Sequence, residues 1–157
     1  MPRRPYKKLK TKIDPIFGNI EVAKLINYTM VDGKKSIARS IIYTIFDKLS
    51  KEKQDPLRIL HQAIQHVSPN YEVKSRRLGG ASYLVPIEVR KNRRLFLALN
   101  WILIAAKSRS NKEYNTFSDK LMAELIDAAK NQGQAVNKKL QVEKLADANK
   151  AFAHLKW

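Results

Sequence analysis

The alternation of polar and apolar residues between positions 71 and 90 is the feature that most restricts the fold of this chain. Residues alternate up to Gly79-Gly80, and the alternation resumes after the glycines through Tyr83, Val85, Ile87 and Val89. A period of two that is interrupted by a glycine pair is typical of a β-hairpin. Two strands alone are marginally stable in water, so the hairpin must rest on helices at its base or on a partner at its tip.

The length of the hairpin loop decides which residues share a face of the hairpin. A two-residue loop at Gly79-Gly80 pairs Arg76 with Tyr83 and places charges on the apolar face. A three-residue loop, residues 79–81, pairs Arg77 with Tyr83 instead and keeps one face apolar near the base. We therefore expect the three-residue loop.

Six segments with apolar residues at helical spacing surround the hairpin. Asn19 can cap the first segment, Asp55-Pro56 opens the third, and Asn92 can cap the fourth. Asp32-Gly33 ends the first segment and Ser68-Pro69 ends the third. The expected core residues, in chain order, are Val22, Leu25, Ile26 and Met30; Ile37, Ile41, Ile42, Ile45, Phe46 and Leu49; Leu57, Leu60, Ile64 and Val67; Leu95, Phe96, Leu99, Ile102, Leu103 and Ala106; Phe117, Leu121, Leu125, Ile126 and Ala129; and Leu145, Ala148 and Phe152.

These patterns predict a mainly α fold: a six-helix bundle with a protruding β-hairpin between the third and fourth helices. The last helix is expected to run from about Ala135 toward His154. We expect a single helical domain over residues 19–157, with the hairpin at residues 71–90. A basic, extended tail over residues 1–18 should precede this domain, because it is rich in charge and proline and poor in apolar residues.

The charge of the chain points to a polyanionic partner. Lysine and arginine number 31 against 14 acidic residues, which gives a net charge of +17. Such an excess repels itself in a compact fold, and a nucleic acid, an anionic membrane surface or an acidic protein would relieve that repulsion.

There is no cysteine, which excludes disulfides and cysteine-based zinc sites. No apolar run of about 18 residues is present, so we expect no membrane-spanning segment.

Residues that often carry catalysis are not arranged for it. His61 and His66 are five residues apart on a helix, which is the wrong step for a shared metal site. The segment 32–36 ends in Lys-Lys-Ser and lacks the glycine spacing of a phosphate-binding loop. The carboxylates are scattered, with no acid paired to a base. We expect neither an enzyme nor a cofactor nor a metal site.

The basic residues instead gather in clusters at turns and element ends. Arginine can bind a phosphate through two parallel hydrogen bonds, and phosphate contacts dominate affinity for nucleic acids. The tail contributes six cations before the first acid, the turn after the first helix two, and the hairpin with the following helix start six. The remaining four lie near the end of the fourth helix and on the last one. The candidate RNA-binding residues are Arg3, Arg4, Lys7, Lys8, Lys10, Lys12, Lys34, Lys35, Lys74, Arg76, Arg77, Arg90, Arg93, Arg94, Lys107, Arg109, Lys138 and Lys139.

Several of these clusters carry a family resemblance. The segments are Asp32-Gly33-Lys34-Lys35-Ser36, Glu72-Val73-Lys74-Ser75-Arg76-Arg77-Leu78-Gly79-Gly80, Val85-Pro86-Ile87-Glu88-Val89-Arg90 with Arg93-Arg94, and Ala148-Asn149-Lys150-Ala151-Phe152-Ala153-His154. In order and spacing they resemble the small-subunit ribosomal protein S-seven family, in its bacterial or organellar form. The resemblance extends from Asp14 to Trp157, and the Met1-Pro2-Arg3-Arg4 opening also matches.

The resemblance implies a structural constituent of the small ribosomal subunit with a helical body and a protruding hairpin. It implies binding to the 3′ major domain of small-subunit rRNA and a part in assembling the subunit head. Exit-site tRNA and mRNA would lie near the hairpin tip, and other head and platform proteins would be neighbours. The location would be the ribosome, in a bacterial cytoplasm or an organelle matrix or stroma. Trp157 could pack on the body or lie on RNA.

Two other readings of the same charge are a DNA-binding regulator and a membrane-surface protein. A basic surface that is spread over several elements does not favour a single helix reading one groove. Clusters at turns and helix ends do not favour an amphipathic helix lying on a membrane.

Overall fold

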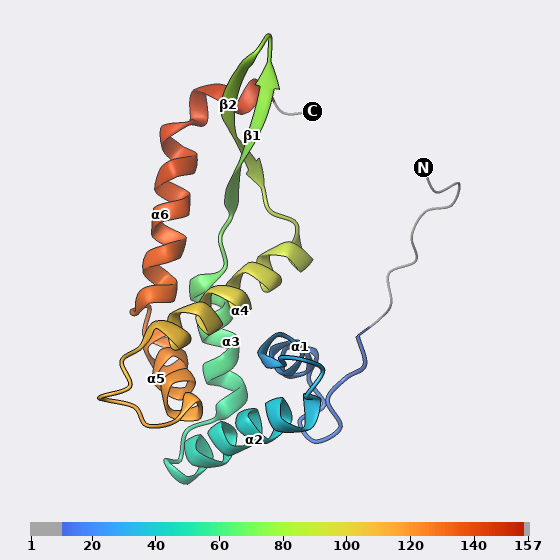
Figure 1. Cartoon of the computed structure of the whole chain (residues 1–157), viewed down its shortest axis with the longest axis vertical. Coiled ribbons are helices and arrows are strands. Elements are labelled where there is room, and N and C mark those ends of the chain that lie inside the picture. Colours follow the sequence, from blue (N-terminus) through green and yellow to red (C-terminus); the bar gives the residue numbers. More distant parts are fainter. Residues whose placement is uncertain (1–10, 156–157) are drawn as a thin grey trace. The chain divides into compact units, whose positions relative to one another are not determined.

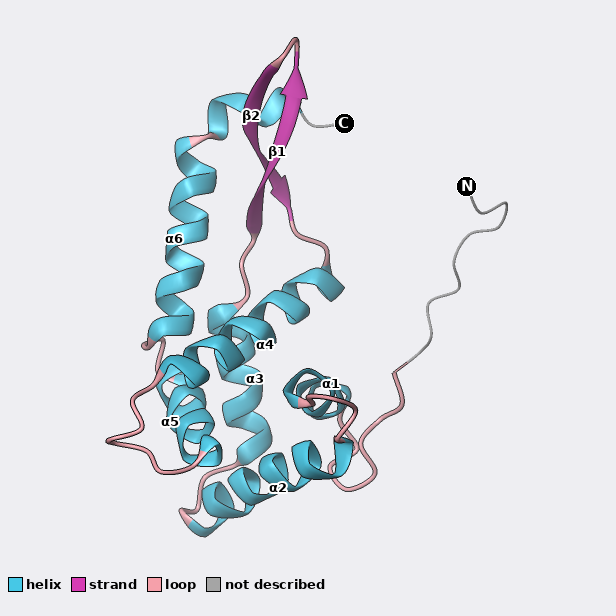
Figure 2. Ribbon diagram, in the orientation of Figure 1, coloured by secondary structure: helices cyan, strands magenta, loops and turns pink. Residues whose placement is uncertain are grey.

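The computed structural model describes residues 11–155 and divides the chain into two compact units, residues 1–40 and 41–157. The predicted tail residues 1–10 and the residues 156–157, with Trp157, lie outside the described part. The elements in order are α1 (Ile20–Thr29), α2 (Lys35–Lys51), α3 (Pro56–Val67), β1 (Tyr71–Leu78), β2 (Ala81–Glu88), α4 (Lys91–Ser108), α5 (Phe117–Ala129), α6 (Gln134–Ala148) and the 3₁₀ helix η1 (Lys150–Leu155). The mainly α fold with a hairpin between the third and fourth helices is confirmed (Figures 1 and 2).

The first unit contains a turn, α1 and the start of α2. Asp14 holds the turn, since its Oδ2 accepts hydrogen bonds from the Ile16 and Phe17 amides at 3.2 and 3.1 Å. Asn19 caps α1 as predicted, accepting from the Glu21 amide at 2.7 Å. The predicted tail boundary at residue 18 therefore lies just before the first helix. The single domain predicted over residues 19–157 stays a prediction.

In the second unit, α3, α4 and α5 pack on one another, and α6 runs beside the hairpin (Figure 1). Asp55 caps α3 in front of Pro56, as predicted, and accepts from the Leu57 amide at 3.0 Å. Most of the predicted stripes are buried, including Ile42, Phe46, Leu60, Leu99, Leu121 and Leu125. Lys48 on α2 lies 2.5 Å from Asp119 on α5, and hydrogen bonds from Lys48 and then Thr116 lower the pKa of Asp119. The helices of the second unit are thus held together by a buried apolar core and by an ion pair between α2 and α5.

The predicted three-residue hairpin loop is wrong. The strands pair Leu78 with Ala81 and Arg76 with Tyr83, so the loop is the glycine pair alone. Gly79 and Gly80 both have positive φ, +56° and +91°. Two-residue hairpin loops with positive φ at both positions match the twist of the strands, and glycine adopts this backbone without strain. Turn geometry therefore outweighed the separation of charged and apolar residues.

The start of α4 and the end of α6 also differ from the prediction. Helix α4 begins at Lys91, so Asn92 lies inside the first turn. No side chain caps this helix; the Arg90 carbonyl accepts from the Arg93 and Arg94 amides, both at 2.9 Å. The last helix ends at Ala148, and a 3₁₀ helix follows.

The predicted inward stripe of the last helix is wrong for the most part. Leu145 is 47% exposed and Ala148 is exposed, whereas the buried residues of α6 are Ala135, Val136 and Ala146. Helix α6 contacts β1 and also α3, α4 and α5. Phe152 is half-buried in η1, where its ring centroid lies 5.3 Å from that of Tyr83 on β2. The C-terminal segment therefore supports the hairpin.

Candidate RNA interface

The hairpin register divides its three basic residues between two faces. Lys74 lies opposite Val85 and Arg76 opposite Tyr83, so both side chains share one face of the hairpin. Arg77 lies opposite Ser82 on the other face. The basic residues thus form a pair and a single residue on opposite sides of the ribbon.

The pair lines an open groove that continues to the start of α4. Lys74, Arg76, Arg90 and Arg93 line this groove, whose volume is about 810 Å³, together with Glu72, Ile87 and Glu88. A smaller groove beside it, about 450 Å³, is lined by Arg90, Lys91 and Arg94 among others. We call the larger one the hairpin groove. Four cations face two carboxylates along it, so its net charge is positive.

Short-range contacts hold the cations at the base of the hairpin. The Glu72 carboxylate lies 3.5 Å from Lys74 Nζ and 3.3 Å from Arg93 Nη2. The Arg93 guanidinium also lies over the Phe96 ring, 5.2 Å from its centroid. Arg94 donates to Asn70 Oδ1 at 2.9 Å. Guanidinium groups that are already oriented lose less entropy on binding a phosphate.

The other predicted residues lie away from the hairpin groove. Lys107 is exposed near the end of α4, and Lys138 and Lys139 lie near the start of α6. Lys12, Lys34 and Lys35 belong to the first unit, where Lys35 is the first residue of α2. Arg3, Arg4, Lys7, Lys8 and Lys10 lie outside the described residues. RNA contact by each of these residues stays a prediction.

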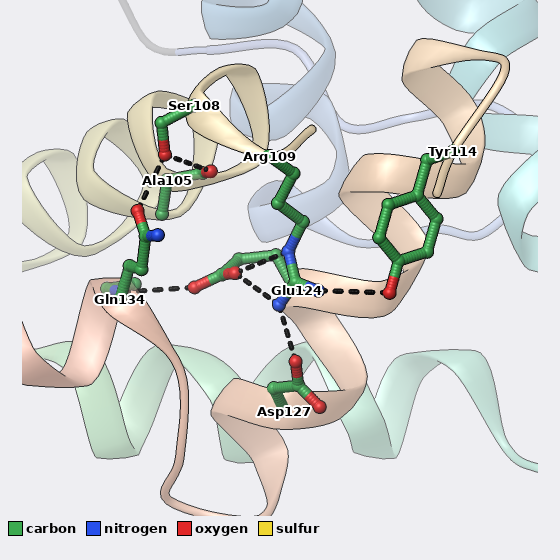
Figure 3. Close-up of polar contacts among 8 residues, drawn as sticks. Ala105, Ser108, Arg109, Tyr114, Glu124, Asp127 and Gln134 are labelled. Carbon is green, nitrogen blue, oxygen red and sulfur yellow. Dashed lines mark hydrogen bonds and ion pairs between the residues drawn. The ribbon is translucent and has the colours of Figure 1, made fainter. Parts of the chain in front are cut away.

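Arg109 is turned into the protein (Figure 3). Its Nε and Nη2 donate to Glu124 Oε2 at 2.8 and 2.6 Å, Nη2 also pairs with Asp127, and Nη1 donates to the Tyr114 hydroxyl at 3.3 Å. Burial alone would lower the pKa of Arg109, but the hydrogen bonds that its guanidinium donates to Asp127 and Glu124 raise it above its ordinary value. Its charge is thus balanced inside the fold, whereas Arg93 pairs with Glu72 at the surface.

The Glu124 carboxylate was not found from the sequence, although it joins three helices. Its side chain is fully buried on α5, and its second oxygen accepts from the Ala135 amide at the start of α6, at 3.0 Å. Arg109, which directly follows α4, binds the same carboxylate. Gly133 makes this possible, because a Cβ there would lie 3.0 Å from Glu124 Oε1 and its φ is +96°. A lone carboxylate among scattered acids gives no sequence signal for such a role.

Two other kinds of site are absent from the described part of the chain. Residues 11–155 contain no group of three or more metal-ligating side chains. None of the helices there is long and apolar enough to cross a membrane.

Comparisons with known proteins agree with the resemblance noted in the sequence. The small ribosomal subunit protein uS7 of Afipia carboxidovorans is 47% identical over 156 residues, which cover 99% of this chain and 98% of that protein. The uS7 proteins of Rhizobium rhizogenes and Rhodopseudomonas palustris are 46% and 47% identical with the same coverage. The family model described as ribosomal protein S7p/S5e matches residues 1–150. The chain therefore belongs to the ribosomal protein S7p/S5e family, whose members are structural ribosomal proteins and not enzymes.

Proposed function

We propose that this protein binds the 3′ major domain of small-subunit rRNA and helps to assemble the head of the subunit. The hairpin groove carries this proposal, because it places Lys74, Arg76, Arg90 and Arg93 along one open surface. RNA segments that meet at a junction repel one another through their phosphates. Cations fixed on a rigid scaffold offset that repulsion for one arrangement of the segments and so favour it.

The proposed contact surface extends beyond the groove. Arg77, Arg94, Lys107, Lys138 and Lys139 add positive charge on the second unit, and Lys12, Lys34 and Lys35 add it on the first. We assign Arg109 to packing instead, because two carboxylates already bind its guanidinium. The hairpin tip would lie near exit-site tRNA and the mRNA path, and other head and platform proteins would be neighbours. The protein would be located in the ribosome, in a bacterial cytoplasm or in an organelle.

A competition assay tests the proposal. The full chain is bound to a labelled transcript of the 3′ major domain in physiological salt, and unlabelled competitors are added. We expect the unlabelled transcript to displace the label at concentrations at least about 1000-fold lower than duplex DNA does, because folded RNA presents the fixed phosphate pattern. Vesicles with anionic lipid should compete no better than the DNA. Equal competition by the DNA would contradict a specific role in the small subunit.

The tail gives a separate prediction. Deleting residues 1–12 removes six cations but leaves Asp14 and the turn that it holds. We expect the thermal transition of the protein to shift by less than about 2 °C, because surface changes away from packed features are nearly neutral. The affinity for the transcript should fall at least tenfold, with a shallower salt dependence. A collapsed thermal transition would show that the tail is part of the folded unit.

A further inference from the structure

A small basic pocket lies within the first unit. Lys12, Lys35 and Arg39 contribute to its wall, and its volume is about 300 Å³. Arg39 did not stand out in the sequence, because it lies between the apolar residues Ile37 and Ile41 near the start of α2. The pocket lies wholly inside residues 1–40.

Arg39 lines this pocket and has an unsatisfied donor. Its Nε is buried and has no hydrogen-bond partner among the residues that the structure describes. A buried donor without a partner is destabilising, and more so when the group is charged. Such groups are rare in native proteins and call for an explanation, of which an absent ligand is one.

The surroundings of Arg39 favour an anion as that ligand. Lys35 lies four residues before Arg39 on α2, so the two cations share a helix face and repel each other. Lys35 is also the first residue of the helix, where unpaired backbone amides add positive potential. Asp14 is the one acid on the pocket wall, and the backbone amides of Ile16 and Phe17 already bind its Oδ2. Three cations therefore face one carboxylate that has other partners.

We propose that this pocket binds a single phosphate group, with Arg39 as the central donor and Lys12 and Lys35 as flanking charges. A phosphate would bind the accessible part of the Arg39 guanidinium and offset the repulsion between Arg39 and Lys35. In the ribosomal complex the group would be one backbone phosphate of the RNA, and this step rests on the proposed function. The site differs from a single exposed lysine, because the half-buried Arg39 joins Lys12 and Lys35 on the wall of one pocket.

Thermal unfolding of the full chain in inorganic phosphate, without RNA, tests the pocket itself. Phosphate is titrated against sodium chloride of equal ionic strength, and the extra stabilisation gives an apparent Kd. We expect Arg39→Gln to raise this Kd at least about tenfold, because it removes both charge and fork geometry. Arg39→Lys should raise it less. In chloride alone Arg39→Gln should unfold at the wild-type temperature or above it, since it removes the repulsion with Lys35.

Arg58→Gln is the matched control, because Arg58 is an exposed arginine on α3. Its Kd for phosphate should equal that of the wild type. If the two glutamine variants lose phosphate binding equally, or if neither does, only general charge screening is at work and the pocket is refuted. Should Arg39→Gln fail to fold, the comparison of Arg39→Lys with Arg58→Lys decides in the same way.

RNA binding is measured in a separate experiment, in sodium chloride. For Arg39→Gln the slope of log affinity for the transcript against log salt should decrease by roughly 0.7 to 0.9, the value for one phosphate contact. An unchanged slope would refute the RNA phosphate as ligand. Failure of the wild-type chain to bind the transcript would contradict the proposed function and leave the phosphate titration as the test of the pocket.

Discussion

Replacing Lys74, Arg76 and Arg77 together with alanine is expected to weaken binding to the 3′ major domain transcript by on the order of 100-fold at low salt. Each lost phosphate contact should cost about 1 kcal/mol or somewhat more. The slope of log affinity against log salt should become shallower by roughly 2 to 3, since each contact contributes about 0.7 to 0.9. Filter binding or fluorescence anisotropy over a range of salt concentrations measures both quantities.

The hairpin register sharpens this experiment. Lys74 and Arg76 share the face that forms the hairpin groove, and Arg77 lies on the other face. If RNA occupies the groove alone, Lys74→Ala with Arg76→Ala should account for most of the loss, and Arg77→Ala should change the slope little. If RNA encloses the ribbon, the two variants should each reduce the slope. The pattern thus reports which face meets the RNA.

The matched control replaces three exposed lysines elsewhere on the second unit, Lys51, Lys112 and Lys130. This variant loses the same net charge of three. We expect its salt slope to stay close to that of the wild type. An equal loss in both triple variants would mean that only total charge matters, and an unchanged slope in the hairpin variant would show that these side chains do not touch phosphate.

The local elements of the fold could be predicted because their signals are local. Asn19 and Asp55 cap their helices as the sequence indicates, since a cap needs only a side chain and an amide two residues away. The hairpin was found from its alternation, but its register was not. The register depends on the backbone angles of Gly79 and Gly80, which the alternation of side chains does not encode.

The last helix shows a different limit. Leu145 lies at helical spacing with other apolar residues and is still 47% exposed, whereas the buried residues of α6 are Ala135, Val136 and Ala146. Helix α6 contacts both the neighbouring helices and the hairpin. Which face of a helix is buried depends on the elements that pack against it. Periodicity alone could not show that α6 packs along the hairpin as well as on the other helices.

For the candidate site, the sequence identified which residues are basic but not which of them pair with a carboxylate inside the fold. Arg90 and Arg109 look alike in the sequence, as arginines at either end of one helix. The structure shows that Glu124 and Asp127 bind Arg109, from positions 15 and 18 residues further along the chain. An acid at that separation can be recognised as a partner only when the packing of α4 on α5 is known. Arg39 was missed for the opposite reason, because nothing near it in sequence marks its buried Nε as unpaired.

Glu124→Ala is expected to lower the free energy of unfolding by about 3 to 5 kcal/mol, as is typical when one partner of a buried ion pair is removed. The change leaves the Arg109 guanidinium without its main partner and the Ala135 amide without an acceptor. It also opens a cavity between α4, α5 and α6. Urea denaturation followed by circular dichroism measures the loss, and Glu113→Ala, at an exposed acid in the nearby loop, should change stability by less than about 0.5 kcal/mol.

Two further variants separate the charge of Glu124 from its packing. Glu124→Gln keeps the volume and an oxygen for the Ala135 amide, so its loss should be smaller than that of Glu124→Ala. Combining Glu124→Leu with Arg109→Met removes both charges, and we expect this pair to be more stable than Glu124→Leu alone, since no guanidinium is left buried without its partner.

Arg109→Ala should also destabilise the protein. At a temperature where this variant is folded, the slope of its log affinity for RNA against log salt should equal that of the wild type. A slope reduced by about one would return Arg109 to the RNA interface, and a Glu124→Ala loss no greater than that of Glu113→Ala would contradict the structural role of the carboxylate.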